Sequence, residues 1–261
     1  MFSLRASVAF LSWTCLLVVN LTHGSEIING NQVKPHSLPF MALLGYPSPF
    51  CGGTLIDSKW VLTAAHCGNI NALQLGVHSI KAKEKEERVR QLRLVMRSFP
   101  HPFYDKNTHS NDLMLLELYE PVKETKWVRA LRLNNNVNDP EGGSVCVVAG
   151  WGTTDYNDKR MSDVLMSVNV TVIDREKCSS AQFYGYSLKI YPNMICAGSD
   201  GDKVADTCQG DSGGPIICDG ALAGVTSFGI RCGLKHKPGV YAFLTPVQLD
   251  WIKLMMKMAE I

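Results

Sequence analysis

Three side chains of this 261-residue chain have the chemistry that a nucleophilic hydrolase requires. The first, Ser212, lies in the stretch 206–215, which reads Asp-Thr-Cys-Gln-Gly-Asp-Ser-Gly-Gly-Pro. Its glycines let the backbone adopt conformations that other residues avoid, which can expose Ser212 and direct backbone N–H groups at a developing oxyanion. Taken alone, the same loop could be an ordinary turn.

A serine hydroxyl is a weak nucleophile at neutral pH, so it needs an adjacent base and a third group that fixes the tautomer of that base. His66 follows the apolar run 60–62 and precedes Cys67, and Asp112 comes directly before an apolar segment that starts at Leu113. Seen alone, each of the two would more often have a structural role. The chain therefore offers a base and an orienting acid, but their spacing does not prove that they meet.

The elements that must position these side chains are short strands. Apolar and β-branched segments recur between turn residues at 40–44, 54–57, 113–118, 145–149, 168–172, 221–227 and 240–244. This rhythm predicts an all-β sandwich or barrel. A helix is predicted at the C-terminus, with Pro246 in its first turn, and Val247, Trp251, Met255 and Met258 at helical spacing are predicted to pack against the core.

Composition and charge indicate a compact globular protein. Hydrophobic residues make up 46% of the chain and charged residues 19%, and the formal net charge of +2 is too small to predict nucleic-acid binding. Residues 1–24 combine Arg5, a short apolar run and small residues before Ser25, which is typical of a cleavable signal peptide. A membrane anchor is the alternative, but the apolar run is short for a span. We expect a soluble mature chain that does not bind membranes.

Cysteine usage agrees with secretion. Of nine cysteines, Cys15 lies in the signal segment, which leaves an even number for up to four disulfides, and spacing alone does not choose among the pairings. A zinc site is disfavoured because the cysteines are dispersed and form no Cys-x-x-Cys pair. We expect neither a metal nor a cofactor.

The order His66, Asp112, Ser212, with the residues that flank each, resembles that of the chymotrypsin-like serine proteases, and the resemblance runs from Ile27 to the C-terminal helix. It implies two six-stranded antiparallel β-barrels, at 27–131 and 132–261, with the active site between them. It also implies that His66 is the general base, that Asp112 orients it, and that the N–H groups of Gly210 and Ser212 form the oxyanion hole. The disulfides that it implies are Cys51–Cys67, Cys146–Cys218, Cys178–Cys196 and Cys208–Cys232.

In this family the residue at the position of Asp206 lies at the bottom of the primary specificity pocket, and Gly229 and Gly239 correspond to its open walls. A carboxylate in a partly dry slot favours a cationic side chain, because its charge would otherwise stay unpaired. The resemblance therefore predicts hydrolysis of peptide bonds after Lys or Arg, through an acyl-enzyme on Ser212.

The resemblance also implies synthesis as an inactive precursor. A cut after Glu26 would free the Ile27 ammonium group, which in this family pairs with the carboxylate before the nucleophile, here Asp211. Only Ser25-Glu26 would remain to be removed after signal cleavage, so a trypsin-like activator is not expected. A two-residue acidic propeptide resembles that of the granule proteases of cytotoxic lymphocytes, where a dipeptidyl peptidase removes it.

Within that group the stretches 27–28, 35–37, 76–80 and 225–229 resemble the granzymes of the A and K type. Protein substrates, a granule proteoglycan and serpin-type inhibitors are the partners that this implies, with secretion or storage in cytoplasmic secretory granules. Phe103 stands where the A type has the cysteine of its covalent dimer, so we expect a monomer. Val77 stands where trypsins place a calcium-binding carboxylate, which argues against that site.

Two alternatives and two surface features stay open. The chain could be a digestive or plasma trypsin-like protease, or a catalytically inactive relative that acts as a binding or antimicrobial protein. The segment 81–97 is rich in both basic and acidic residues, and is either a solvated loop and hairpin or a basic patch for an anionic partner. Asn169 is the one sequon outside the signal segment and is a candidate for glycosylation, although it lies in a strand-like stretch.

Overall fold

The structure is a computed structural model that describes residues 30–82, 88–135, 137–153, 160–185, 188–199, 206–230, 232–234 and 236–259. The predicted signal peptide, the dipeptide Ser25-Glu26 and Ile27 lie outside these described residues. No helix in the described part of the chain is both long and apolar enough to cross a bilayer.

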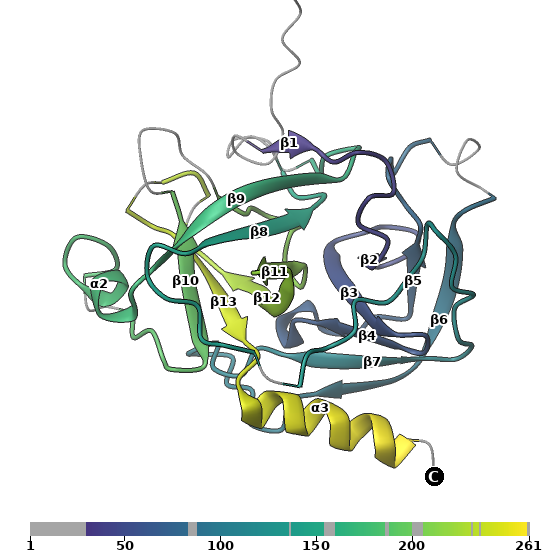
Figure 1. The fold of residues 1–261 in the computed structure, drawn as a ribbon. Helices are drawn as coiled ribbons and strands as arrows, with labels where there is room; N and C mark the ends of the chain where they lie inside the picture. Colours follow the sequence, from purple (N-terminus) through teal and green to yellow (C-terminus); the bar gives the residue numbers. More distant parts are fainter. Residues whose placement is uncertain are drawn as a thin grey trace, which may run out of the picture.

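The first barrel is built from six antiparallel strands that close in the order β2-β3-β4-β7-β6-β5 (Figure 1). The strands are β2 (Met41–Leu44), β3 (Cys51–Asp57), β4 (Trp60–Thr63), β5 (Ala72–Leu75), β6 (Gln91–Pro100) and β7 (Met114–Leu118). Its interior is aliphatic, because Leu55, Leu62, Leu73 and Leu115 are fully buried. Such burial of apolar surface is the main favourable contribution to folding.

The second barrel has the strand order β9-β10-β13-β12-β11-β8, and an additional pairing of β8 with β9 closes it. The strands are β8 (Val145–Gly150), β9 (Met166–Ile173), β10 (Met194–Gly198), β11 (Pro215–Cys218), β12 (Ala221–Phe228) and β13 (Gly239–Phe243). The predicted fold class of two six-stranded antiparallel barrels with a C-terminal helix is therefore confirmed. The short strand β1 (Asn31–Gln32) precedes the first barrel in sequence but pairs with β9 of the second.

The helices are few. A 3₁₀ turn, η1 (Ala65–Cys67), follows β4, α2 (Arg175–Ser179) follows β9, and α3 (Pro246–Ala259) ends the described chain. Asp174 accepts hydrogen bonds from the N–H groups of Glu176 and Lys177, so it caps the N-terminus of α2. In Figure 1, α3 lies below both barrels, against the end of the molecule where β13 runs out.

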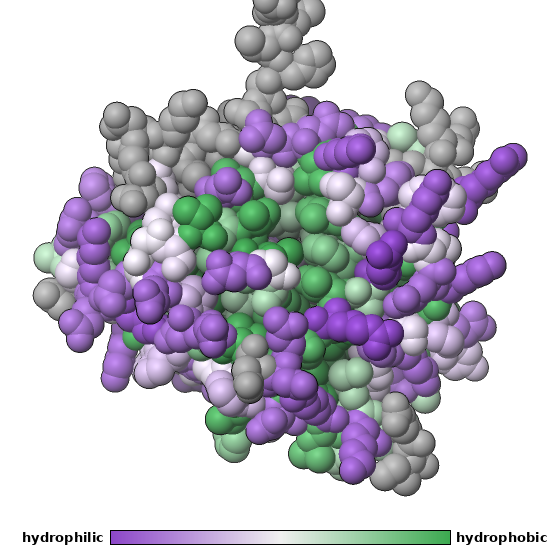
Figure 2. All heavy atoms as spheres, viewed as in Figure 1, coloured by the Kyte–Doolittle hydropathy of each residue, from purple (hydrophilic) through white to green (hydrophobic). Residues whose placement is uncertain are grey.

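The predicted buried stripe of α3 is partly wrong. Val247 and Met258 are exposed, at 69% and 58%, whereas the residues that α3 buries are Gln248, Leu249 and Ile252. Trp251 and Met255 are half-buried against the core, as predicted. The helix is rotated relative to the prediction because polar Gln248 faces inward, where hydrogen bonds satisfy its amide. Figure 2 shows hydrophobic and hydrophilic side chains side by side over α3, while polar side chains cover much of the rim of this face.

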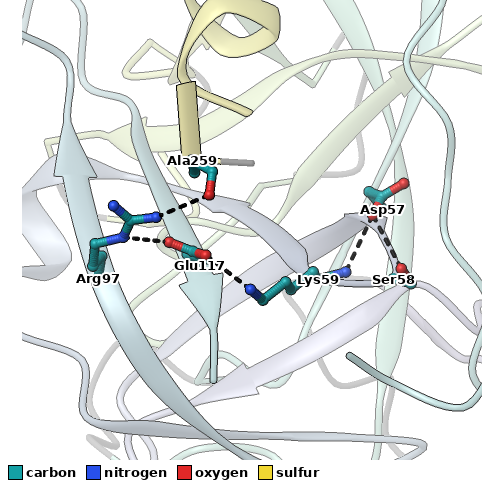
Figure 3. A network of polar contacts seen from close by, with 6 residues as sticks. All are labelled: Asp57, Ser58, Lys59, Arg97, Glu117 and Ala259. Atoms are coloured by element: carbon teal, nitrogen blue, oxygen red, sulfur yellow. Dashed lines mark hydrogen bonds and ion pairs between the residues drawn. The ribbon is translucent and has the colours of Figure 1, made fainter. Parts of the chain in front are cut away.

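An ion cluster around a buried carboxylate of the first barrel involves α3 as well. Glu117 of β7 is 1% exposed and contacts Lys59 Nζ at 3.0 Å and Arg97 Nε at 2.5 Å. Figure 3 shows the two cations on either side of this carboxylate, and Arg97 also donates to the carbonyl of Ala259, at the end of α3. Burial alone would raise the pKa of Glu117, but its hydrogen bonds with Arg97 and Lys59 and their charges hold that pKa below its usual range.

Part of the segment 81–97 is described, and three of its arginines contact the chain itself. Arg90 donates to the carbonyl of Ser79, Arg93 to the carbonyls of Pro121 and Leu92, and Arg97 to Glu117. Residues 91–97 belong to β6, and 83–87 lie outside the described residues. The arginines of β6 therefore contribute to local structure, which favours the hairpin interpretation.

Four disulfides fasten the loops. They join the pairs that the resemblance implies, Cys51–Cys67, Cys146–Cys218, Cys178–Cys196 and Cys208–Cys232. The first links the start of β3 to η1, which carries His66, and the last links two loops of the second barrel.

Candidate active site

A cleft of about 430 Å³ receives residues from both barrels. Its lining comprises His66, His109, Asp206, Thr207, Cys208, Gln209, Ser212, Thr226, Ser227, Phe228, Gly229, Cys232 and Gly239. The first two come from segments of the first barrel, and the rest belong to the second. The structure therefore brings His66 and Ser212 to one cavity, although 146 residues separate them in the chain.

His66 and Asp112 form a tightly bonded pair. The backbone N–H of His66 donates to Asp112 Oδ1 at 2.9 Å, and its ring Nδ1 lies 2.7 Å from Asp112 Oδ2. The hydroxyl of Ser227 also donates to Oδ2. His66 is partly exposed at the cleft, whereas Asp112 lies fully buried behind it. This places the imidazole between a buried carboxylate and the cavity, with its Nδ1 held by Asp112 Oδ2.

The carboxyl group of Asp112 stays ionised in this setting. Burial alone would raise its pKa, but the hydrogen bonds from His66 and Ser227, together with the positive charge that His66 can carry, hold the pKa of Asp112 below its usual range. A buried carboxylate that accepts this many donors can stabilise a cation that forms beside it.

The loop that carries Ser212 is bound to the first barrel through the backbone. The carbonyl of Ser212 accepts a 2.7 Å hydrogen bond from Gly52 N in β3. The next residue, Gly213, has φ +80°, and a Cβ there would lie 2.1 Å from Thr63 Oγ1 and 2.4 Å from Gly52 O. Only glycine fits both this left-handed backbone and this close approach. The sharp turn thus fixes the position of Ser212 relative to the strand that leads to His66.

The N–H groups predicted to form an oxyanion hole are unengaged. Within the described residues, neither Gly210 N nor Ser212 N donates to a protein acceptor. Gly210 has φ +97°, a backbone conformation that residues with side chains rarely adopt. Unpaired N–H groups beside a nucleophile can stabilise an oxyanion that develops there.

Asp206 forms one end of the same cleft and is 4% exposed. Its Oδ2 accepts a 2.9 Å hydrogen bond from Gly233 N, while Oδ1 is buried with no hydrogen-bond partner in the described part of the chain. Burial raises the pKa of Asp206 to about 7, and its backbone hydrogen bonds offset only part of that effect. Gly229 and Gly239 also line the cleft. Their backbones lie close together, since a Cβ added at Gly229 would be 3.9 Å from Gly239 Cα.

Asp211, directly before Ser212, is completely buried. Its oxygens accept hydrogen bonds from Gly152 N at 2.8 Å and Cys208 N at 2.9 Å. Burial raises the pKa of Asp211 to about 6, because two backbone donors compensate only partly for lost hydration. The predicted partner, Ile27, lies outside the described residues, so the predicted ion pair stays a prediction.

The structure adds residues that the sequence analysis did not single out. Ser227 contacts Asp112, Gly52 holds the carbonyl of Ser212, and Gly150 and Gly152 make room for the carboxylate of Asp211. The motif 150–152, Gly-Trp-Gly, was the available signal, since two glycines around a buried Trp suggest a close backbone approach.

One group of metal-ligating side chains occurs in the described residues, and it consists of Cys51, His66 and Cys67. Its two cysteines are joined to each other in a disulfide and offer no thiolate. His66 is bonded to Asp112 instead. The residues therefore do not fit a metal site.

Comparisons with known proteins agree with this geometry. A family model described as Trypsin matches residues 27–252. Granzyme A of Bos taurus is 44% identical over 230 residues, which cover 87% of this chain and 86% of that protein. Kallikrein-8 of Homo sapiens is 41% identical over 234 residues, which cover 87% and 85%. The solved structure of neuropsin, described as a serine protease expressed in the limbic system of mouse brain, matches with a TM-score of 0.77 and 38% identity, over 87% of this chain and 98% of that chain.

Proposed function

Because the chain belongs to the trypsin family of serine proteases, we propose that it is a secreted or granule-stored endopeptidase that cleaves peptide bonds after Lys or Arg. The observation that carries this proposal is the position of Asp206 in the cleft that also holds His66 and Ser212. A substrate residue that reaches Asp206 would place the following peptide bond beside Ser212.

In the proposed mechanism, Ser212 Oγ attacks the carbonyl carbon while His66 takes its proton. Asp112 holds the imidazole through the 2.7 Å contact at Nδ1 and stabilises its cation. The N–H groups of Gly210 and Ser212 donate to the oxyanion of the tetrahedral intermediate. His66 then protonates the leaving amine, and a water molecule hydrolyses the acyl-enzyme with the same residues in the same roles.

The specificity follows from the electrostatics of Asp206. Its Oδ1 is buried and has no protein partner in the described residues, so a guanidinium or ammonium group in the cleft would supply the hydrogen bonds and charge that it lacks. A neutral side chain would leave this oxygen buried and unsatisfied. Gly229 and Gly239 add no side chains to the cleft, which leaves room for a long substrate side chain.

The test is a peptide-library cleavage profile of chain that starts at Ile27. We expect cleavage after Lys and Arg, complete loss of activity in Ser212→Ala, and a loss of kcat/KM on Arg substrates well above tenfold in Asp206→Ala. The matched control is Asp250→Ala, which removes an equal charge from an exposed position of α3. A loss of tenfold or less in Asp206→Ala would refute the assignment of this pocket.

We also propose that the enzyme is made as a precursor and activated by removal of Ser25-Glu26. The buried carboxylate of Asp211 supports this, because its two backbone hydrogen bonds compensate only partly for the hydration lost on burial, and a cation beside it would stabilise the ionised form. Chain starting at Ile27 should be active and full-length chain inactive. Equal activity of both forms would contradict the proposal.

The type of protease is the finer question. We favour the granzyme A/K type because of the acidic dipeptide before Ile27. The 41% identity with kallikrein-8 favours a second candidate, an extracellular protease of kallikrein type. N-terminal sequencing of protein purified from its source cells, combined with localisation, distinguishes the granzyme type from the kallikrein type. Storage in granules is expected only for the granzyme type.

Surface features complete the proposal. Asn169 is exposed on β9, so an N-linked glycan there is sterically accessible, and peptide-N-glycosidase should shift the wild type but not Asn169→Gln on a gel. We propose a monomer, which a non-reducing gel tests. Serpin-type inhibitors and a granule proteoglycan stay candidate partners, although the arginines of β6 are engaged within the chain.

A further inference from the structure

A polar network directly before Asp112 is not part of the proposed mechanism. Asn111 Oδ1 accepts two hydrogen bonds, from Asn193 Nδ2 and from Gln248 Nε2, both at 2.8 Å. Its own Nδ2 donates to the carbonyl of Phe103 at 3.0 Å, and Asn193 Nδ2 also contacts Ser110 Oγ at 3.1 Å. Both sides of the Asn111 amide are therefore bonded.

The partners come from separate parts of the fold. Asn111 lies in the loop between β6 and β7 of the first barrel, Asn193 directly precedes β10 of the second, and Gln248 lies in the first turn of α3. Each partner is itself held in place. The carbonyl of Asn193 accepts from Phe243 N at 2.9 Å, and the hydroxyl of Thr245 donates to Gln248 Oε1, which directs Nε2 to Asn111.

Asn111 determines where Asp112 can lie. Its φ of +55° is a left-handed conformation that Asn tolerates better than most residues. Its carbonyl accepts a 2.7 Å hydrogen bond from Leu113 N, so Asp112 is the central residue of a three-residue turn. A rotation of Asn111 would therefore swing the carboxylate of Asp112 away from His66.

We infer that Asn111 is a positioning residue for the Asp112–His66 pair, held by Asn193 and Gln248, so that the pair is aligned only when the second barrel and α3 are docked on the first barrel. The inference rests on the proposed catalytic role of Asp112. It adds the requirement that the two barrels and α3 are docked, which does not follow from the contacts of His66, Asp112 and Ser212 alone.

The experiment compares Asn193→Leu, Gln248→Leu and Asn111→Gly in chain that starts at Ile27. The leucines keep the side-chain size and remove the donors, while glycine keeps the left-handed backbone accessible and removes the amide. The control is Arg97→Leu, which loosens the other end of α3 through its contact with Ala259 and does not touch the Asp112 loop.

Each leucine variant should lower kcat about tenfold with KM within twofold of wild type, and Asn111→Gly about a hundredfold, because misplacement of a catalytic group by about 1 Å can cost about 10²-fold. The acid limb of the kcat/KM profile should move to lower pH, since a displaced carboxylate stabilises the protonated imidazole less. The double variant Asn193→Leu, Gln248→Leu should lose less than the product of the single losses, because both donors act on one acceptor.

Arg97→Leu should lower Tm and leave kcat and the acid limb unchanged. Folded variants at Asn193, Gln248 and Asn111 that lower Tm in the same way, with kcat and the acid limb of wild type, would overturn the inference. Asn111→Gly is the variant that decides if a leucine variant fails to fold. Labelling of Ser212 by a fluorophosphonate distinguishes a failure of the proposed function from a failure of this inference. A wild type that is neither labelled nor active overturns both. A labelled, active wild type with unaffected variants overturns only the inference.

Discussion

The substitution Gly152→Ala tests how closely the reactive loop depends on the site that holds Asp211. The backbone of Gly152 is outside the left-handed region, so alanine causes no backbone strain there. The added Cβ, however, would lie 2.3 Å from Asp211 Oδ2 and 2.4 Å from its Cγ. Such contacts do not occur in folded proteins, so either the carboxylate or the segment of Gly152 must move.

The size of the effect can be worked from these distances. To reach even 3.0 Å the carboxylate must retreat by at least about 0.7 Å, and the backbone of Gly150 lies close on its other oxygen, since a Cβ added at Gly150 would be 2.1 Å from Oδ1. The 2.8 Å hydrogen bond from Gly152 N would be strained or lost, and the loss of a hydrogen bond to a charged group lowers stability by about 1.5–3 kcal/mol. Because Ser212, the proposed nucleophile, follows Asp211, a similar shift of its hydroxyl should lower kcat/KM about 10²-fold.

The assay is kcat/KM on an Arg substrate together with thermal unfolding. The control is Gly142→Ala, where the new Cβ would meet its neighbours at 3.4 Å or more and the backbone is also outside the left-handed region. This control should keep wild-type activity within threefold. If Gly152→Ala is folded and as active as Gly142→Ala, the argument that Asp211 requires this close approach is refuted.

Three further outcomes are expected. The pKa of Asp206 is raised to about 7, and its carboxyl group must lose a proton to bind a cation. The inhibition constant of benzamidine should therefore rise as pH falls from 7 towards 5 and stay flat above pH 8. A constant value between pH 7 and pH 5 would contradict the raised pKa. Replacing Cys51 and Cys67 together by Ala should lower the free energy of unfolding by about 3 kcal/mol in urea and reduce activity, because the 16-residue loop that they close carries His66. Burial lowers the pKa of His101 in the folded protein, so as pH falls the unfolded chain binds a proton at this residue before the folded chain does. The free energy of unfolding should therefore decrease as pH drops below about 6.5, and it should decrease less in His101→Asn.

The sequence predicted seven of the twelve barrel strands and did not single out β4, β5, β6, β10 and β11. Four of these five carry no charged residue, so charge does not explain why they were missed. All seven predicted segments overlap strands, from β2 to β13. The ten-residue strand β6 lies in the segment 81–97, for which the sequence left a solvated loop and hairpin or a basic patch open, and its Leu92, Leu94 and Met96 are exposed. Its place in the barrel is decided by pairing with β5 and β7, which are distant in sequence. The local sequence pattern contains no information about such long-range pairing.

The site shows the same division between local and long-range information. His66, Asp112, Ser212 and Asp206 lie in short, distinctive motifs, so the residue types that do chemistry could be picked out from the sequence. Resemblance to a known family, and not the spacing, was needed to predict that they meet, because the cleft is assembled from segments of two barrels.

The residues that went unnoticed are those whose role exists only after the barrels dock. Gln248 and Asn193 are ordinary polar residues in sequence, and the predicted core stripe of α3 did not include Gln248. In the structure it is 5% exposed, and its amide is satisfied by Thr245 and Asn111. A buried amide is tolerated only where such partners are in place. The rotation of α3 and the position of the loop before Asp112 thus depend on one hydrogen-bond network, and a substitution that restores an all-apolar face to α3 should disturb catalysis before it disturbs the fold.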